Sequence, residues 1–133
     1  MIKISRKSKG SNAERELVNM FWSAGWASCR VAGSGSAPHP SPDVLAGKGS
    51  RRLVIECKST RELKKYLEQK QVDELRLFAS LFGAEPWIGV RFDVLKWYFI
   101  GLDDLSKTGS GYVVSIQLAK HKGLLFNELI GEF

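Results

Sequence analysis

Apolar residues recur along the chain at spacings that separate predicted helices from predicted strands. After Ser11, apolar positions on one helical face continue to a natural stop at Gly25. A second stripe at helical spacing starts near Gln69 and ends at Gly83. The stripe residues of these two predicted helices are Leu17, Val18, Phe21, Trp22, Val72, Leu75, Phe78 and Phe82.

Short apolar runs between and after these helices predict strands. The expected strands cover residues 26–32, 43–46, 53–58, 86–92 and 96–102, with short strands at 66–67 and 112–116 and a short terminal helix at 124–130. Residues 97–100 are apolar on both strand faces, which fits either an interior strand or a dimer contact. A chain of 133 residues is expected to form one domain with one sizeable core.

The first ten residues are basic and show no apolar period. Residues 1–10 are predicted to form a flexible arm before a single domain at 11–133. Lys9 in this arm either contacts phosphates or belongs to a disordered terminus. Ser11 and Glu14 have the spacing of a capping box, which predicts that the first helix begins at Ser11. Glu14 therefore has two interpretations, a helix cap and a further ligand of a metal ion or water.

The most informative stretch is residues 43–58, a predicted hairpin with charges in an apolar setting. Asp43 begins it, and its second strand carries Glu56 and Lys58 on one face, because side chains alternate along a strand. Two carboxylates and one ammonium group that converge here would suit Mg²⁺, with the Cys57 carbonyl as a further ligand. Lys58 would orient or deprotonate the attacking water of a phosphodiester hydrolysis. The alternative is a set of ion pairs on a solvated strand face.

Further candidate residues surround this stretch. Residues 33–42 form a polar loop rich in glycine, serine and proline, which either closes over a substrate backbone or is a plain surface loop. Arg15 could bind phosphate with two hydrogen bonds or be an ordinary exposed arginine. Arg30 interrupts an apolar context, and Gln71 either reaches the site from a helix start or lies in solvent.

Charge is distributed unevenly along the chain. Residues 1–70 carry 14 Lys and Arg against 6 Asp and Glu, whereas residues 71–133 carry 6 against 8, which gives +8 and −2 and the net +6. The candidate site lies in the positive half. A basic surface beside such a site favours a nucleic-acid partner, because Lys and Arg displace counterions from phosphates.

Several classes of protein are disfavoured by what the sequence lacks. No apolar run is long enough to span a membrane, and the basic start has no signal-peptide core. Cys29 and Cys57 are isolated, which predicts neither a zinc site nor a disulfide and makes a reducing cytoplasm the expected location. Because dinucleotide and P-loop fingerprints are missing, we expect no organic cofactor.

Taken together, these segments resemble the archaeal-type Holliday junction resolvases of the PD-(D/E)xK nuclease superfamily. The resemblance covers nearly the whole chain and continues through Gln71 and its helix. The segments that carry it are K-G-S-N-A-E-R-E-L, C-R-V-A-G-S-G-S, P-S-P-D-V-L-A, I-E-C-K-S, G-A-E-P-W-I-G-V and L-K-W-Y-F-I. It implies an α/β fold with a mixed central β-sheet flanked by helices, the restriction-endonuclease-like nuclease core.

The resemblance also implies roles for particular residues. Glu14, Asp43 and Glu56 would be the acidic metal-site residues and Lys58 the catalytic lysine. The remaining matches are Arg15 and Arg30 as functional arginines, Ser34 as the serine of the catalytic loop, and Gln71 near the site. Loop length before Asp43 varies in such proteins, so the role is open between Ser34 and Ser36.

The implied activity is Mg²⁺-dependent cutting of paired strands at a four-way DNA junction by a homodimer, with Mn²⁺ as a substitute metal. Two matched nicks call for two identical sites, which a two-fold dimer supplies. Recognition should depend on the DNA backbone and shape. Two alternatives stay open: a nuclease of the same superfamily that cuts linear, flap or forked DNA, and a DNA-binding module without catalysis.

Overall fold

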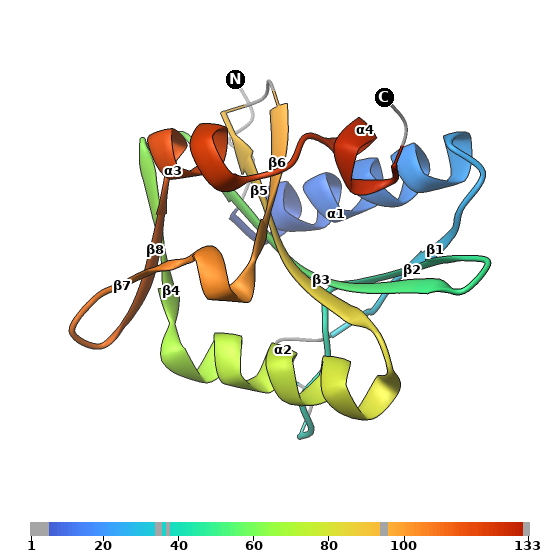
Figure 1. The fold of residues 1–133 in the computed structure, drawn as a ribbon, viewed down its shortest axis with the longest axis horizontal. Coiled ribbons are helices and arrows are strands. Elements are labelled where there is room, and N and C mark those ends of the chain that lie inside the picture. The colour runs from blue at the N-terminus through green and yellow to red at the C-terminus, as the bar shows by residue number, and fades with distance from the viewer. Residues whose placement is uncertain (1–5, 34–35, 37, 94–95, 132–133) are drawn as a thin grey trace.

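The structure of the protein, a computed structural model, describes residues 6–33, 36, 38–93 and 96–131, with side chains from residue 12 onwards (Figure 1). In chain order its elements are α1 (Arg6–Ser23), β1 (Ala27–Arg30), β2 (Val44–Lys48), β3 (Arg51–Thr60), β4 (Lys64–Glu68), α2 (Gln69–Phe82), β5 (Glu85–Phe92), β6 (Lys96–Gly101), η2 (Leu102–Asp104), β7 (Ser106–Lys107), β8 (Gly111–Ser115), α3 (Ile116–Lys122) and α4 (Phe126–Leu129). None of the described helices is long and apolar enough to cross a membrane.

The central sheet is mixed, as the family resemblance implies. Its described strands have the order β1–β2–β3–β5–β6. Strands β3 and β5 run parallel, while the other neighbours are antiparallel. Parallel neighbours need a crossover connection, and β4 with α2 supplies it. A smaller sheet of order β4–β8–β7 lies beside the first. The prediction of a mixed sheet flanked by helices is therefore confirmed.

Strand β3 is buried on both faces, so the expected single core is divided by the sheet. Val54 and Ile55 are both fully buried, and each belongs to a different apolar cluster. Helices α1 and α4 cover the face of Ile55, and α2 covers the face of Val54 (Figure 1). A strand covered on both faces is apolar at successive positions, so charges within it stand out.

The apolar run of β6 is explained by burial within the chain. Trp97, Tyr98, Phe99 and Ile100 are all buried, with Tyr98 and Ile100 in the cluster on the α2 face and Trp97 and Phe99 in the cluster on the α1 face. The alternative of a dimer contact through this strand is therefore not needed.

The predicted start of the first helix is wrong. Helix α1 begins at Arg6, so Ser11 lies inside the helix and is not an N-cap, and Glu14 is not the third residue of a capping box. Lys and Arg are good helix formers, and each residue added to an existing helix gains a backbone hydrogen bond. The basic segment therefore extends the helix. Of the predicted arm, residues 6–10 are helical, and residues 1–5 lie outside the described chain.

Local signals located the second helix well and missed a third. Helix α2 ends as predicted at Gly83, whose φ of 77° is the left-handed conformation that favours glycine. Residues after β8 form α3, where the Ser115 hydroxyl accepts a hydrogen bond from the Leu118 amide at 3.0 Å. Only Ala119 of this seven-residue helix is fully buried, so it has little apolar periodicity by which to recognise it.

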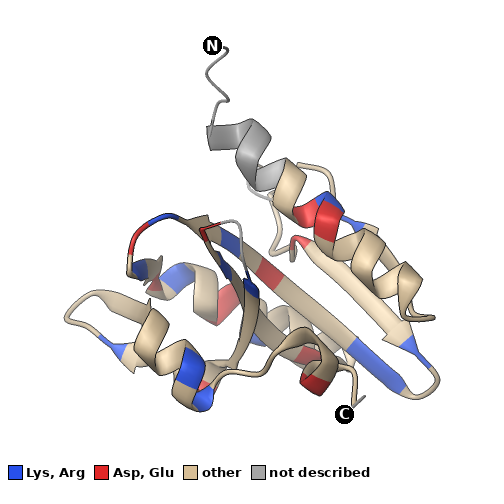
Figure 2. Cartoon of the chain, turned by 90° about the horizontal axis from the view of Figure 1, so that it is seen from above, with Lys and Arg blue, Asp and Glu red and all other residues tan. Residues whose placement is uncertain are grey.

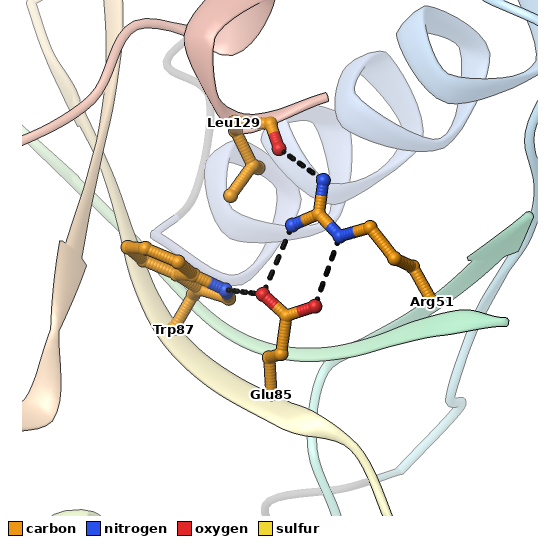
Figure 3. Close-up of polar contacts among 4 residues, drawn as sticks. All are labelled: Arg51, Glu85, Trp87 and Leu129. Atoms are coloured by element: carbon orange, nitrogen blue, oxygen red, sulfur yellow. Dashed lines mark hydrogen bonds and ion pairs between the residues drawn. The ribbon is translucent and has the colours of Figure 1, made fainter. Parts of the chain in front are cut away.

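At the start of β3, one arginine joins three segments (Figure 3). Arg51 Nε and Nη2 donate to the two oxygens of Glu85 on β5 at 3.0 and 2.9 Å, and Nη1 donates to the Leu129 carbonyl of α4 at 2.7 Å. The guanidinium also lies 5.4 Å from the ring centroid of Trp26. Hydrogen bonds from Arg51 lower the pKa of Glu85. We call Arg51, Glu85, Trp26 and the Leu129 carbonyl the Arg51 clamp.

Candidate active site

Asp43 is held at the junction of three strands. Its backbone amide donates to the Ile55 carbonyl at 3.1 Å, and its carbonyl accepts from Val31 at 2.8 Å. Its side-chain Oδ2 accepts a hydrogen bond from the backbone amide of Cys57 at 2.8 Å. These contacts turn the Asp43 carboxylate towards β3 just before β2 begins.

Glu56 and Lys58 share one face of β3, as the strand period predicts. Lys58 Nζ lies 3.6 Å from Glu56 Oε1, and both side chains are mostly buried. The Glu56 carboxyl also shares a hydrogen bond with Asp43. The prediction that Asp43, Glu56 and Lys58 converge is therefore confirmed.

Burial and the closeness of a second carboxyl together dominate the electrostatics of this group. Burial, followed by the charge of Asp43, raises the pKa of Glu56 to about 8, while Lys58 acts in the opposite direction. A protonated Glu56 donates to Asp43, which further favours its neutral form. At neutral pH the pair therefore retains a proton that a cation would displace.

The donor set fits a hard divalent cation. Mg²⁺ in proteins uses one or two carboxylates and fills its other positions with water and substrate phosphate. Asp43 and Glu56 supply two such carboxylates beside each other. Within the described part of the chain, no group of three or more acidic, histidine or cysteine side chains is gathered closely enough to hold a metal ion. A third ligand from Glu14 thus stays a prediction.

Glu14 reaches the same region from α1. Its Oε1 lies 3.5 Å from Arg30 Nε of β1. Burial and the charge of Asp43 raise the pKa of Glu14, and the charges of Arg30, Arg15 and Lys58 lower it. Since α1 starts too early for Glu14 to cap it, the structure leaves this residue as a partly buried carboxyl beside the candidate site. Arg15 is exposed on the same helix.

A pocket of about 290 Å³ opens over the paired carboxyls and extends to the start of α2. Gln71 lines this pocket with Asp43 and Glu56. Its Oε1 also accepts from the Glu68 amide at 3.3 Å, so it caps α2 as well. The interpretation of Gln71 as a purely solvent-exposed residue is therefore wrong.

Sequence reasoning missed other residues at this pocket. His39, Glu68 and Lys70 line it, although none was assigned to the site. Glu68 and Lys70 belong to the crossover connection between β3 and β5. No local sequence motif indicates that this connection passes next to Asp43 and Glu56. A sequence signal did exist for Lys70, because it lies next to Gln71 at the predicted helix start.

Two predicted DNA contacts cannot be placed. Ser34 lies outside the described residues, as does the side chain of Lys9. Ser36 is described, and its hydroxyl donates to the Gly33 carbonyl at 3.2 Å, which is a local turn contact. The backbone of Lys9 belongs to α1.

Basic residues lie on both sides of the acidic position in β3. The strand starts with Arg51 and Arg52, continues to Glu56 and then reaches Lys58. Figure 2 shows the acidic segment in the middle of this strand, with the basic hairpin tip at one end. The pocket lining itself carries four carboxyls, Asp43, Glu56, Glu68 and Glu74, against one lysine, Lys70, so the pocket favours a cation, and the basic residues of β3 lie outside its lining.

Comparison with known proteins agrees with this architecture. The family model for the archaeal Holliday junction resolvase (Hjc) matches residues 5–133. A crossover junction endodeoxyribonuclease Hjc of Archaeoglobus fulgidus is 40% identical over 133 residues, covering 95% of this chain and 98% of the relative. The corresponding protein of Methanocaldococcus jannaschii is 32% identical over 123 residues, covering 92% and 87%.

A solved structure shows the same fold. The structure of Archaeoglobus fulgidus Hjc, described as a Holliday junction resolvase, superposes with a TM-score of 0.85 at 36% identity. The match covers 92% of this chain and 100% of that chain. The chain therefore belongs to the archaeal Holliday junction resolvase (Hjc) family.

Proposed function

We propose that this protein is a structure-selective endonuclease that resolves four-way DNA junctions by metal-dependent hydrolysis of phosphodiesters. The observation that carries the proposal is that Asp43 and Glu56 line one pocket, with Lys58 beside Glu56, in a chain of this family. Paired carboxylates beside an ammonium group supply what hydrolysis of a phosphodiester requires, namely cation binding, a positioned water and charge stabilisation.

Each residue of the site has a task in this proposal. Asp43 and Glu56 hold the cation, together with the Cys57 carbonyl. When bound, Mg²⁺, or Mn²⁺ in its place, polarises the scissile phosphate and acidifies its bound water. Lys58 is held by Glu56 at 3.6 Å, and it orients the attacking water and donates to the phosphate. A bound cation would displace the proton that the carboxyl pair shares.

Residues around the pocket hold the DNA. Glu14 Oε1 orients Arg30, whose Nε lies 3.5 Å away. Arg15 follows Glu14 on α1. Their guanidinium groups contact backbone phosphates, which fix register without reading sequence. Gln71 lines the pocket and supports the bound phosphate or water. Ser34 and Lys9 are proposed as further DNA contacts.

The active form in this proposal is a homodimer. A surface of α2 and α1 supports it, because large apolar side chains are exposed there: Trp22 at 58%, Leu77 at 51%, Leu81 at 81% and Phe82 at 49%. Phe82 lines both the groove along α2 and the groove that includes Trp22 and the β1–β2 strands, so the apolar surface is continuous. A second copy of the chain would bury it on a two-fold axis and present two matched sites.

Substitution on this surface tests the dimer. Leu81→Lys should reduce the mass in sedimentation from a dimer to a monomer, because a lysine would have to be buried without a partner. Leu63→Lys is the matched control, since Leu63 is 71% exposed on β4's side of the molecule. A parent protein that sediments as a monomer at all concentrations would contradict the dimer.

Cleavage of a synthetic four-way junction tests the activity. In Mg²⁺, Glu56→Gln should cut at least about a hundredfold more slowly while still binding the junction, because it loses a cation ligand but keeps the phosphate contacts. Asp104→Asn, at an exposed position in η2, should cut like the parent. Full activity of Glu56→Gln would contradict the assignment of the site.

The same assay separates the alternatives. Excess linear duplex should compete poorly with labelled junction if the protein is structure-selective. Equal competition would favour a general nuclease acting on linear, flap or forked DNA. Salt-sensitive binding without any metal-dependent cutting would favour a non-catalytic module.

A further inference from the structure

Strand β4 presents an exposed aromatic ring beside the candidate active site. Tyr66 is 65% exposed, while the next residue, Leu67, is buried in the apolar core. Because side chains alternate along a strand, Tyr66 shares its outward face with Lys64 and Glu68. Tyr66 therefore points away from the core, on the solvent face of the β4–β8–β7 sheet.

This outward face continues into the catalytic pocket. Glu68 lines the pocket that contains Asp43 and Glu56. Two residues along a strand span about 7 Å, so Tyr66 lies on the same strand face at about that distance from Glu68, a residue of the pocket lining. In a nucleic acid, a base lies at a similar distance from the phosphate next to it. A base beside a scissile phosphate in the pocket would therefore be within reach of Tyr66.

The segment around Tyr66 is suited to nucleic acid in its charge as well as its ring. Residues 61–70 contain Arg61, Lys64, Lys65 and Lys70 against Glu62 and Glu68. Lysine and arginine attract the phosphate backbone, and an exposed aromatic ring offers a surface on which a base stacks. A ring in this setting therefore differs from an isolated apolar residue on a neutral surface.

We infer that Tyr66 stacks on a base exposed at the branch point of the DNA substrate. The inference rests on the proposed function and adds a residue that selects the substrate. Within a continuous duplex both faces of each base are covered by its neighbours. At a branch point the stack is interrupted, so a base face is open to Tyr66. The ring thereby recognises the discontinuity itself, next to the phosphate that is cut.

Three variants separate stacking by the ring from general apolar contact and from effects on folding. Tyr66→Phe keeps the ring, Tyr66→Leu keeps an apolar side chain without a ring, and Tyr66→Ala removes both. Because Tyr66 is 65% exposed, all three should unfold at the temperature of the parent. Binding is measured in Ca²⁺ to a junction with 2-aminopurine at the branch point and to a linear duplex of the same length. Cleavage is measured in Mg²⁺.

The expected result is a selective loss. Tyr66→Ala and Tyr66→Leu should bind the junction about tenfold more weakly and lose the 2-aminopurine signal of the parent complex. Tyr66→Phe should behave like the parent, and binding to linear duplex should stay unchanged in all three. The advantage of junction over duplex in cleavage should fall in parallel with binding.

Two different failures can be told apart. If the parent cuts junctions and Tyr66→Ala binds and cuts them equally well, or loses junction and duplex binding equally, the role of Tyr66 is overturned and the proposed function stands. If the parent neither binds nor cuts junctions selectively, the proposed function fails, and this inference fails with it.

Discussion

The paired strands β3 and β5 carry two carboxyl groups whose pKa values are shifted in opposite directions. Glu85, at the start of β5, receives two hydrogen bonds from Arg51 at the start of β3, and its pKa is lowered. Further along, Glu56 is buried beside Asp43, and its pKa is raised to about 8. Burial and a neighbouring carboxyl both raise the pKa of Glu56, whereas the bonded guanidinium outweighs partial burial at Glu85.

The opposite pKa shifts distinguish a carboxyl that stabilises the fold from a carboxyl that is suited to binding a cation. A carboxylate with a matched guanidinium is already satisfied and contributes to holding elements together. Two carboxyls pressed together are unfavourable for the protein alone, and they become favourable when a cation binds between them. The Arg51 clamp is therefore assigned to stability, and the Asp43–Glu56 pair to activity.

The largest predicted effect is on how the free energy of unfolding depends on pH, and it comes from the raised pKa of Glu56. Glu56 holds its proton in the folded protein up to about pH 8, whereas the unfolded chain releases it near the ordinary value of 4.5. Stability should thus fall as pH rises from about 4.5 to about 8 and level off above it. The loss amounts to a few kcal/mol, since one unit of pKa shift corresponds to about 1.4 kcal/mol.

Urea unfolding of the parent and Glu56→Gln at several pH values measures this effect. The variant should be more stable than the parent at pH 8, and the two should approach each other near pH 4.5, because the amide does not ionise. Glu62→Gln, at an exposed position, should follow the parent. Parallel curves for parent and Glu56→Gln would show that the carboxyl pair carries no such penalty.

Breaking the Arg51 clamp should lower the stability of the protein by a smaller amount, without changing its activity. Arg51→Met should lower the free energy of unfolding by about 1–2 kcal/mol, because it removes a two-point ion pair and the bond to the Leu129 carbonyl. The rate of junction cleavage should not change under conditions where the variant is folded. Thermal unfolding and the cleavage assay measure the two quantities.

A second arginine supplies the control for this substitution. Arg76 lies 3.3 Å from Asp103, whose side chain is 91% exposed. Arg76→Met should change stability by less than about 0.5 kcal/mol, because water screens an exposed pair. Equal losses for Arg51→Met and Arg76→Met would remove the structural role given to the clamp.

Local patterns predicted those features that depend on neighbours in the chain. Helix α2 and its stop at Gly83 followed from an apolar stripe and a glycine, and the shared face of Glu56 and Lys58 followed from the strand period. The start of α1 was wrong, because a capping pattern at Ser11 does not prevent helix from forming before it. Motif resemblance supplied the site residues, which residue spacing alone left open.

The sequence by itself determined the mixed α/β fold, the shared face of Glu56 and Lys58, and the family. Only the tertiary structure decided that Asp43 contacts Glu56, that Lys70 and Glu68 reach the same pocket, and that Tyr66 is exposed on the strand that ends at Glu68. The physical reason is that periodicity and capping act within a few residues. The distances between charges, and therefore their pKa values, depend on how separate strands are brought side by side.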